Sequence, residues 1–293
     1  MYSDCKTYLI LFGGVFTLST SAIFVKAADA PSAVIAFYRL LIAGMVLLPF
    51  FLLNSKSRGE LRSLRAREWR QIISAGFFLA LHYVMWFESL KFTSIASSTM
   101  LVSMQPLFSL GIDRFVQRRS IRMTALVGCA VALVGCAVIG AGDLQISGDS
   151  LFGDILAFAA AGVIALYFFV GEKVRQEVSA LTYSVLGYLV SAVILAVYSA
   201  LQSEPFVGYA DETWLAFVGL ALIATIGGQF VFNLLLKKVS ASAVTMSILG
   251  EPIGTCILAY LLLGEGILLQ QFVGIAVIML GMTIFFSRPT YRS

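Results

Sequence analysis

Two ionisable residues lie inside long apolar stretches of the sequence, where a charge needs a specific reason to be present. Glu251 stands between Gly250 and Pro252 in one stretch, and Arg39 interrupts another. A charged side chain at the centre of a membrane-spanning helix costs roughly 2.5–3.5 kcal/mol on insertion scales. A carboxylate there would accept a proton or face a cation, and a guanidinium would bind a substrate carboxylate. Both residues have a structural alternative, which is a bond across helices that holds the fold together.

The single histidine of the chain belongs to an aromatic segment that would suit ligand binding. His82 and Trp86 are four residues apart and share one face of a helix, with Tyr83 and Met85 beside them. Aromatic faces bind ring-bearing or apolar ligands by stacking, and Trp or Tyr attracts an ammonium group through cation–π contact. The alternative is that His82 is a hydrogen-bonded core residue.

Polar and proline residues mark two further helical segments. Gln229 and Asn233 lie one turn apart in an apolar stretch, so they must face protein or water rather than lipid. Pro106 and Pro252 interrupt two other apolar stretches. Proline frees a backbone carbonyl and bends a helix, so these two residues are expected to act as hinges of gating helices. A fixed kink is the alternative for each.

The composition shows which elements must position these residues. Of 293 residues, 59% are hydrophobic and only 12% are charged, and the mean hydropathy is +0.93. Soluble domains carry roughly 25% charged residues, so a soluble enzyme is excluded. Each span needs roughly 20 apolar residues. The apolar runs predict an all-α integral membrane protein with ten spans, at 7–25, 31–53, 71–90, 95–116, 121–141, 151–171, 181–201, 213–236, 241–263 and 267–287.

The basic residues predict how these spans are oriented. With ten spans and a cytoplasmic amino terminus, 17 of the 20 Lys and Arg residues fall on the cytoplasmic side. Both termini are therefore expected in the cytoplasm. The net charge of +4 is interpreted as this orientation signal and not as a nucleic-acid surface. The basic loop from Asn54 to Arg70 either fixes topology alone or forms a short helix on the inner lipid headgroups.

The chain contains an internal repeat at an offset of 146 residues. The segment from Leu90 to Met100 resembles that from Leu236 to Met246, and Pro106, Gly128 and Gly135 align with Pro252, Gly274 and Gly281. The repeats are predicted to be 1–146 and 147–293, with five helices each. Because five is odd, the second repeat is inverted in the membrane, an arrangement that builds a midplane site open to each side in turn. The glycine pairs permit close helix packing within the chain or a dimer contact.

Four sequence features resemble the EamA family of the drug/metabolite transporter superfamily over essentially the whole chain. They are the arginine in Ala36–Leu41, the turn Ser89–Ser94, the segment Ser247–Pro252 and the pair Gly264-Glu265. The segment Ala80–Phe87 also resembles the third span of amino-acid exporters of the YddG kind. In one departure, Arg118-Arg119 stands where the first unit of the family often has Gly-Glu. In another, Gln105 stands opposite Glu251 in the repeat.

The resemblance implies a secondary transporter that exports small amino acids or related metabolites across the bacterial cytoplasmic membrane by alternating access. Drug or cation efflux and metabolite uptake stay open, and protons are an open coupling partner. An intramembrane enzyme is disfavoured because the sequence lacks metal-ligand and nucleophile motifs. The four cysteines have no paired or metal-ligand spacing, so no metal or cofactor is expected. The expected partners are a small-molecule substrate and the bilayer, and the protein would be a monomer or homodimer.

Overall fold

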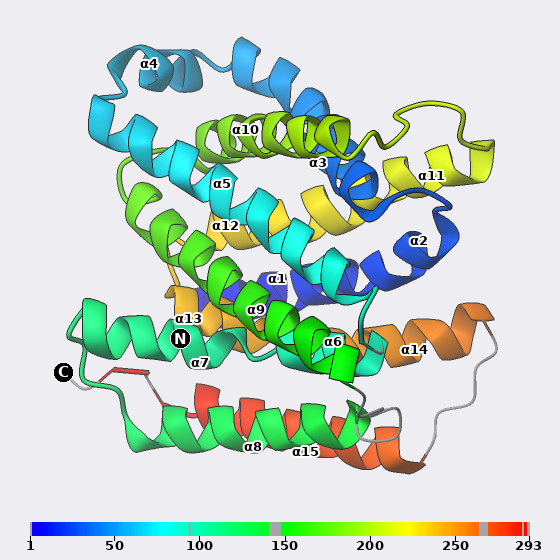
Figure 1. Ribbon diagram of the computed structural model, residues 1–293. Helices are drawn as coiled ribbons and strands as arrows, with labels where there is room; N and C mark the ends of the chain where they lie inside the picture. Colours follow the sequence, from blue (N-terminus) through cyan, green and yellow to red (C-terminus); the bar gives the residue numbers. More distant parts are fainter. Residues whose placement is uncertain (1, 94, 141–147, 264–268, 289, 292–293) are drawn as a thin grey trace. The chain divides into compact units, whose positions relative to one another are not determined.

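The computed structural model describes residues 2–93, 95–140, 148–263, 269–288 and 290–291, and this part of the chain is helical (Figure 1). In chain order the elements are α1 (Tyr2–Ser19), α2 (Ser21–Ala27), α3 (Ser32–Leu53), α4 (Ser55–Ser63), α5 (Ala66–Ser89), α6 (Ile95–Val102), α7 (Gln105–Gly111), η1 (Ile112–Val116), α8 (Met123–Gly140), α9 (Gly148–Val174), α10 (Ala180–Leu201), α11 (Asp211–Gly219), η3 (Leu220–Phe230), α12 (Val231–Leu235), α13 (Ala241–Ile248), α14 (Glu251–Leu263) and α15 (Leu269–Phe286). Elements η1 and η3 are π-helical. The predicted all-α class is confirmed. The Gly264-Glu265 pair lies outside the described residues.

Eight helical segments of the described chain are long and apolar enough to cross a membrane. They are Lys6–Ala27, Ser32–Leu53, Ala66–Ser89, Ser150–Val174, Ala180–Leu201, Asp211–Leu235, Ala241–Leu258 and Leu269–Phe286. A further apolar helix, Met123–Ile139, is shorter. The expected span at 95–116 is divided among α6, α7 and η1. The chain is therefore a multi-pass membrane protein by length and composition, and the number of ten spans stays a prediction.

Contacts divide the chain into two compact units, and each unit draws on both halves of the sequence. The first unit contains residues 1–84 and 166–240, and the second contains residues 85–165 and 241–293. Helices α5 and α9 each pass from one unit into the other. The repeat boundary after residue 146 concerns the sequence and stays a prediction, but helices from both sides of it build the core of each unit.

The first unit is organised around α3 packed along α10, and α1 packed on η3 and α12. Small residues let α1 approach η3 closely. A Cβ added at Gly228 would lie 3.1 Å from the carbonyl oxygen of Gly14, and one added at Gly14 would lie 3.0 Å from the Phe232 ring. This close packing fixes η3, which carries Thr225 and Gln229.

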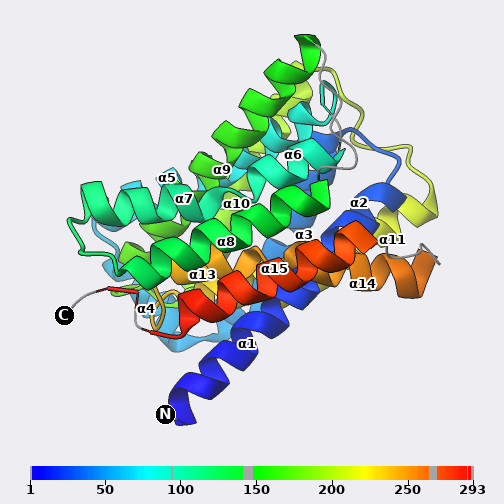
Figure 2. The ribbon, with the colours of Figure 1, turned by 90° about the horizontal axis from the view of Figure 1, so that it is seen from below.

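The second unit contains the most extensive helix pair of the chain, α8 with α15, which run side by side (Figures 1 and 2). Gly128 and Gly135 of α8 meet Gly281 and Gly274 of α15. A Cβ on Gly128 would lie 2.5 Å from the backbone nitrogen of Phe285, and one on Gly281 would lie 2.4 Å from that of Ala132. The glycines therefore bring the two backbones together, and the packing role expected for them is confirmed within the chain.

Candidate functional site

A cluster of buried polar and aromatic side chains lies inside the first unit and is organised by Asn233. The Tyr167 hydroxyl donates to Asn233 Oδ1 at 2.9 Å. Asn233 Nδ2 donates to Ser184 Oγ at 3.0 Å and to the Tyr188 hydroxyl at 3.4 Å. The backbone oxygen of Asn233 accepts from Arg175 Nε at 2.8 Å. Asn233, predicted as a substrate ligand, thus has each of its polar groups bonded within the protein and braces α9, α10 and α12.

Arg39 enters the first unit from α3 and is 1% exposed. Its Nε donates to Thr225 Oγ1 at 3.1 Å, and Thr225 in turn donates to the Leu220 carbonyl at 2.9 Å, five residues back in the π-helix η3. The Arg39 guanidinium carbon lies 4.8 Å from the centre of the Tyr83 ring, which stabilises the cation through the ring face. Arg39 Nη2 has no hydrogen-bond partner among the described residues.

Gln229 lies on the same element as Thr225, four residues further along, and is 4% exposed. No acceptor meets its Nε2 at hydrogen-bond geometry in the described part of the chain, although its side chain lies close to the Tyr167 hydroxyl. The hydroxyl of Tyr183, on α10, is also buried without a partner at hydrogen-bond geometry, and it too lies close to the Tyr167 hydroxyl. The ring of Tyr183 is 6.1 Å from that of Tyr167, so it belongs to the same cluster. Buried polar groups are normally hydrogen-bonded, so each of these atoms needs an explanation.

The residues of the predicted aromatic face of α5 belong to two different units. His82 and Tyr83 are buried in the first unit, with ring centres 5.2 Å apart. The face of the Tyr83 ring supports the Arg39 guanidinium. Trp86, one turn after His82, is assigned to the second unit, where its ring stacks on that of Phe87 with centres 5.1 Å apart. The structure therefore brings Tyr83 together with Arg39 and stacks Trp86 on Phe87.

Glu251 belongs to the second unit and is the first residue of α14. It is partly buried, and its backbone carbonyl accepts a hydrogen bond from Thr255 Oγ1 at 3.1 Å. The carboxylate therefore stands at the start of a helix within an otherwise apolar segment, where the helix dipole favours negative charge. This position lies in a break of the expected span at 241–263.

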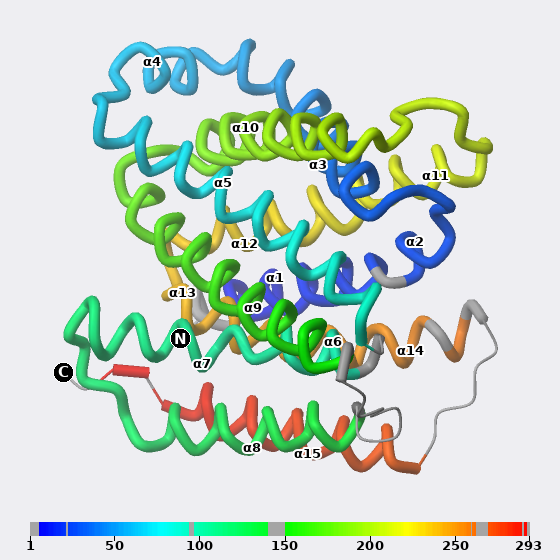
Figure 3. The backbone as a smooth tube through the Cα atoms, viewed as in Figure 1, coloured from blue at the N-terminus to red at the C-terminus, as the bar shows by residue number. Residues whose placement is uncertain are grey.

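The break before Glu251 has a counterpart in the first repeat, at the position that the 146-residue offset gives (Figure 3). Helix α6 ends at Val102 and α13 ends at Ile248, and the next helices begin at Gln105 and Glu251. The backbone N–H of residue 104 donates to residue 101 at 3.1 Å, and that of residue 250 donates to residue 247 at 2.9 Å. The two repeats therefore share an interrupted helix, down to the individual hydrogen bond.

The predicted hinge prolines lie at these interruptions. Pro106 and Pro252 are each the second residue of the helix that follows the break. Proline is tolerated in the first helical turn because its missing N–H would have no intrahelical acceptor there. The bend thus comes just before each proline, and not at a proline inside a continuous helix. Movement about these positions stays a prediction.

Two buried or bonded carboxylates that the sequence had not singled out connect helix ends of the second unit. Asp113, 1% exposed, accepts from the Tyr291 hydroxyl at 2.7 Å, from Gln117 Nε2 at 2.7 Å and from Ser242 Oγ. It also forms an ion pair with Arg119 at 3.4 Å. Asp113 thus connects η1, the start of α13 and the segment after α15.

The second of these carboxylates, Asp154 on α9, ties that helix to the start of α6. It accepts hydrogen bonds from Thr93 Oγ1 at 2.7 Å and from Ser97 Oγ at 2.8 Å. A carboxylate accepting two hydroxyl donors forms charge-assisted bonds, which are stronger than neutral ones. Asp113 and Asp154 therefore hold the two ends of the interrupted segment that contains α6, α7 and η1.

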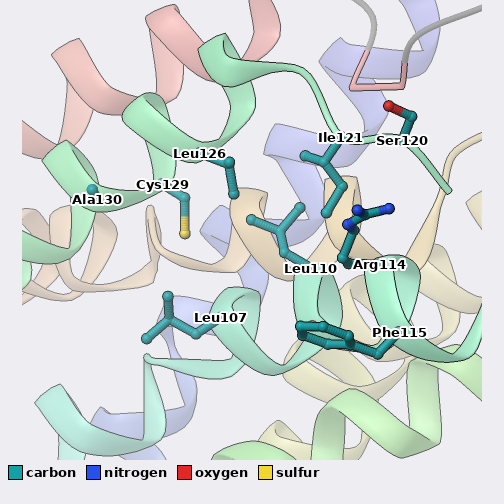
Figure 4. Close-up of a pocket in the computed structure, with 10 residues that line it drawn as sticks. Leu107, Leu110, Arg114, Phe115, Ser120, Ile121, Leu126, Cys129 and Ala130 are labelled. Atoms are coloured by element: carbon teal, nitrogen blue, oxygen red, sulfur yellow. The ribbon is translucent and has the colours of Figure 1, made fainter. Parts of the chain in front are cut away.

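A surface hollow of the second unit is lined by none of the predicted site residues, although its lining residue Leu107 directly follows Pro106. It has a volume of about 490 Å³ and is lined by α7, η1, α8 and the segment joining them, with Leu107, Phe115 and Cys129 among its residues (Figure 4). Its lining is predominantly apolar, and Phe115 is 82% exposed. On a membrane-spanning segment such a surface suits lipid contact, so we locate the candidate site in the polar cluster of the first unit.

Sequence reasoning missed several members of the cluster, including Tyr167, Tyr183, Tyr188 and Thr225. Each is a neutral polar residue in an apolar span, where a hydroxyl carries little signal by itself. One pattern was visible, because Tyr183, Ser184 and Tyr188 place three hydroxyls within six residues. Only the packing of α9 and α10 against α12 shows that these hydroxyls converge on Asn233.

The interrupted helices and the polar intramembrane cluster are accompanied by a family match over nearly the whole chain. The model of the EamA-like transporter family matches residues 6–141 and again residues 151–287. The chain belongs to the EamA-like transporter family. It is therefore a membrane transporter of the drug/metabolite transporter superfamily, with the family's two units in one polypeptide.

Three curated relatives are similar over most of their length. The uncharacterized transporter YwfM of Bacillus subtilis (strain 168) is 23% identical over 99% of this chain and 96% of its own. The uncharacterized transporter YdfC of the same strain is 24% identical over 79% of this chain and 74% of its own. An uncharacterized transporter of Archaeoglobus fulgidus is 23% identical over 89% of this chain and 91% of its own.

A solved crystal structure of a protein also aligns with the EamA chain. It has a TM-score of 0.81 at 18% identity and covers 97% of both chains. At this identity the likeness shows the fold alone. The family and the relatives describe a transporter, while the resemblance to exporters of the YddG kind stays a prediction.

Proposed function

We propose that this EamA protein exports small amino acids or related metabolites across the cytoplasmic membrane by alternating access. The observation that carries the proposal is the pair of helix interruptions at equivalent positions of the two repeats, α6–α7 and α13–α14. Non-helical backbone inside a membrane is tolerated where it lines a cavity or is covered by protein. Broken helices in inverted repeats are the usual framework of a transporter's binding site.

The repeated breaks support a mechanism in which each interrupted helix moves at its break. A helix that is already broken can tilt there without losing a regular i to i−4 hydrogen bond. The Asp113 and Asp154 connections hold the two ends of the first interrupted segment, so opening at either end requires one of these carboxylates to release its donors. The hinge role proposed for Pro106 and Pro252 follows from their place directly after the breaks.

The side chains of the first unit support an amphipathic substrate. Arg39, Tyr83 and Gln229 offer a cation, an aromatic ring and an amide, which match the carboxylate and apolar body of an amino acid. His82 adjoins Tyr83 and extends the aromatic surface on α5. Aromatic amino acids are therefore included in the proposed substrate class. Trp86 remains a proposed contact of the same helix.

Glu251 supports a second candidate, the coupling of transport to protons or the efflux of a cation. It is the acidic residue at the start of α14, inside an apolar segment. Its counterpart in the first repeat is Gln105, which is neutral. The first residue after the break is therefore charged in the second repeat and neutral in the first. The Glu251→Gln variant, measured across pH, tests this candidate. Loss of the pH dependence supports coupling through Glu251, and an unchanged profile assigns Glu251 to structure.

The test of the main proposal is counterflow in proteoliposomes. Purified protein is reconstituted with a panel of unlabelled amino acids inside, and entry of each labelled amino acid is followed. We expect saturable counterflow for at least one amino acid and none in empty liposomes. Direction is then measured with inverted membrane vesicles. A folded protein that gives no counterflow with any amino acid of the panel contradicts the proposed substrate class.

A further inference from the structure

Two buried nitrogen donors of the first unit are left without partners in the described structure, and both belong to the cluster around Tyr83 and Thr225. Arg39 Nη2 and Gln229 Nε2 each have less than 1 Å² of exposed surface and no acceptor there. A buried donor without a partner costs about 1–3 kcal/mol, and more when it is charged. Such a donor suggests a missing acceptor.

Both donors are related to Thr225 of the π-helix η3. Arg39 is fixed by its bond to Thr225, and Gln229 follows Thr225 by four residues on η3. Tyr83 lies under the guanidinium and near Tyr167, which anchors the next turn of the same segment at Asn233. Because the polar groups of Asn233 and Thr225 are already bonded, the open donor nitrogens of the cluster are those of Arg39 and Gln229, in addition to the Tyr183 hydroxyl.

The charge of Arg39 indicates the kind of acceptor that is missing. Among the described residues no carboxylate lies within ion-pair distance of Arg39, and its contacts are the Thr225 hydroxyl and the Tyr83 ring. Intramembrane arginines are normally paired. Arg175, the other buried arginine of this unit, is committed to the backbone oxygens of Asn233 and Val178. Glu60 acts electrostatically on Arg175, so the charge left without an anion in the described cluster is that of Arg39, which a single carboxylate balances.

We propose that Arg39 and Gln229 bind the carboxylate of the transported substrate, so that the substrate class is restricted to molecules with one free carboxylate. The inference rests on the proposed export function and deepens it. Arg39 Nη2 donates to one carboxylate oxygen and Gln229 Nε2 donates to the carboxylate from η3. Tyr83 holds the guanidinium, and Thr225 fixes its Nε, so the donor is in place before the substrate arrives.

The first experiment compares each transported amino acid with its carboxamide, in which a neutral amide replaces the carboxylate. The full chain is assayed by proteoliposome counterflow. We expect the wild type to transport the acid and reject the amide. Arg39→Gln should raise KM for the acid roughly 10- to 100-fold, the range expected when a hydrogen bond to a charged group is lost. Arg62→Gln, an exposed residue of α4, is the matched control and should behave as wild type. A folded Arg39→Gln protein with wild-type KM overturns the proposal.

A second variant keeps the test valid if Arg39→Gln does not fold. Gln229→Glu places a carboxylate on η3 four residues after Thr225, which bonds Arg39, and so supplies an anion from the protein itself. We expect it to raise the unfolding temperature by forming the missing ion pair and to weaken transport of the acid by occupying the site. Gln202→Glu, at an exposed position after α10, is its control and should change neither. Wild-type KM in the Gln229→Glu protein contradicts the carboxylate site.

Failure of the export function is distinguished by a binding measurement that needs no transport. Sodium benzoate, a monocarboxylate, should raise the unfolding temperature of the detergent-purified wild type above that in equimolar sodium chloride. It should leave the Gln229→Glu protein unchanged. If no amino acid is transported but this difference is observed, the anion site stands and the proposed substrate is wrong. If benzoate has no effect on the wild type, or the same effect on both proteins, the anion site is wrong.

Discussion

Replacing Gly281 with alanine tests the close contact between α8 and α15. The new Cβ would lie 2.4 Å from the backbone nitrogen of Ala132 and 2.7 Å from its Cα, whereas ordinary contact begins near 3.4 Å. Because the obstructing atoms are backbone, the helices must separate by about 1 Å. Such a gap removes a quarter to a half of each contact's 0.1–0.2 kcal/mol, so roughly 30 atom pairs lose about 2 kcal/mol. Overpacked cores show losses of the same order, about 1–3 kcal/mol.

The assay is thermal unfolding of the purified protein in detergent. A loss of about 2 kcal/mol corresponds to a fall of roughly 4–8 °C in unfolding temperature, taking the change expected for domains of about 200 residues. Gly13→Ala is the matched control because a Cβ there meets nothing within 4 Å. Alanine favours a helix over glycine by about 0.5–1 kcal/mol, so this control should be as stable as wild type or more stable. If Gly281→Ala unfolds at the temperature of the control, the two backbones are not in close contact.

Three further predictions concern positions outside the cluster. Arg118 has a φ of 55°, so Arg118→Gly should relieve the strain of the left-handed conformation and stabilise the protein by about 1 kcal/mol. The unfolding temperature should therefore rise, and a decrease would contradict this prediction. Burial raises the pKa of Glu60, but hydrogen bonds from Ser179 and Thr182 outweigh it, so the net pKa is lowered. The stabilisation by Glu60 is therefore full above the ordinary glutamate pKa of about 4.3 and is lost as pH falls through the lowered value. Glu60→Gln should be less stable than wild type at pH 7, and the difference should shrink in acid; a constant difference would refute the assignment. Tyr291→Phe removes a donor from buried Asp113 and should lower the unfolding temperature, while an unchanged value would show that this bond contributes nothing to stability.

At Arg118 the sequence departs from the family pattern at a position whose backbone conformation suits glycine. The resembled family often has Gly-Glu at this point, and the repeat counterpart of Arg118 in this chain is Gly264. The structure gives Arg118 a positive φ, a conformation that glycine adopts without strain. The next residue, Arg119, forms an ion pair with Asp113, so the second arginine has a structural role that its count as a cytoplasmic charge did not reveal.

The sequence by itself determined the all-helical membrane class, the presence of two similar units and the polar residues that needed an explanation, while the inversion of the second unit stays a prediction. Hydropathy and repeat spacing are local or pairwise properties of the chain, so they can be read without coordinates. The two prolines, Pro106 and Pro252, also indicated a disturbance of the helix at these points, because proline is tolerated at few positions of a helix. The 146-residue offset further indicated that both breaks would occur at equivalent positions, as the structure shows.

Only the tertiary structure decided which of the polar residues still have unmet bonding capacity. Asn233 and Gln229 look equivalent in the sequence, as two amides one turn apart, yet Asn233 is fully bonded and the amide nitrogen of Gln229 is not. The difference arises because Tyr167, Ser184 and Tyr188 come from helices distant in sequence and converge on one amide. The environment of Arg39 likewise depends on Tyr83 and Thr225, which contact its guanidinium. The energy of a charge in an apolar environment is set by the atoms around it in space and not by its neighbours along the chain.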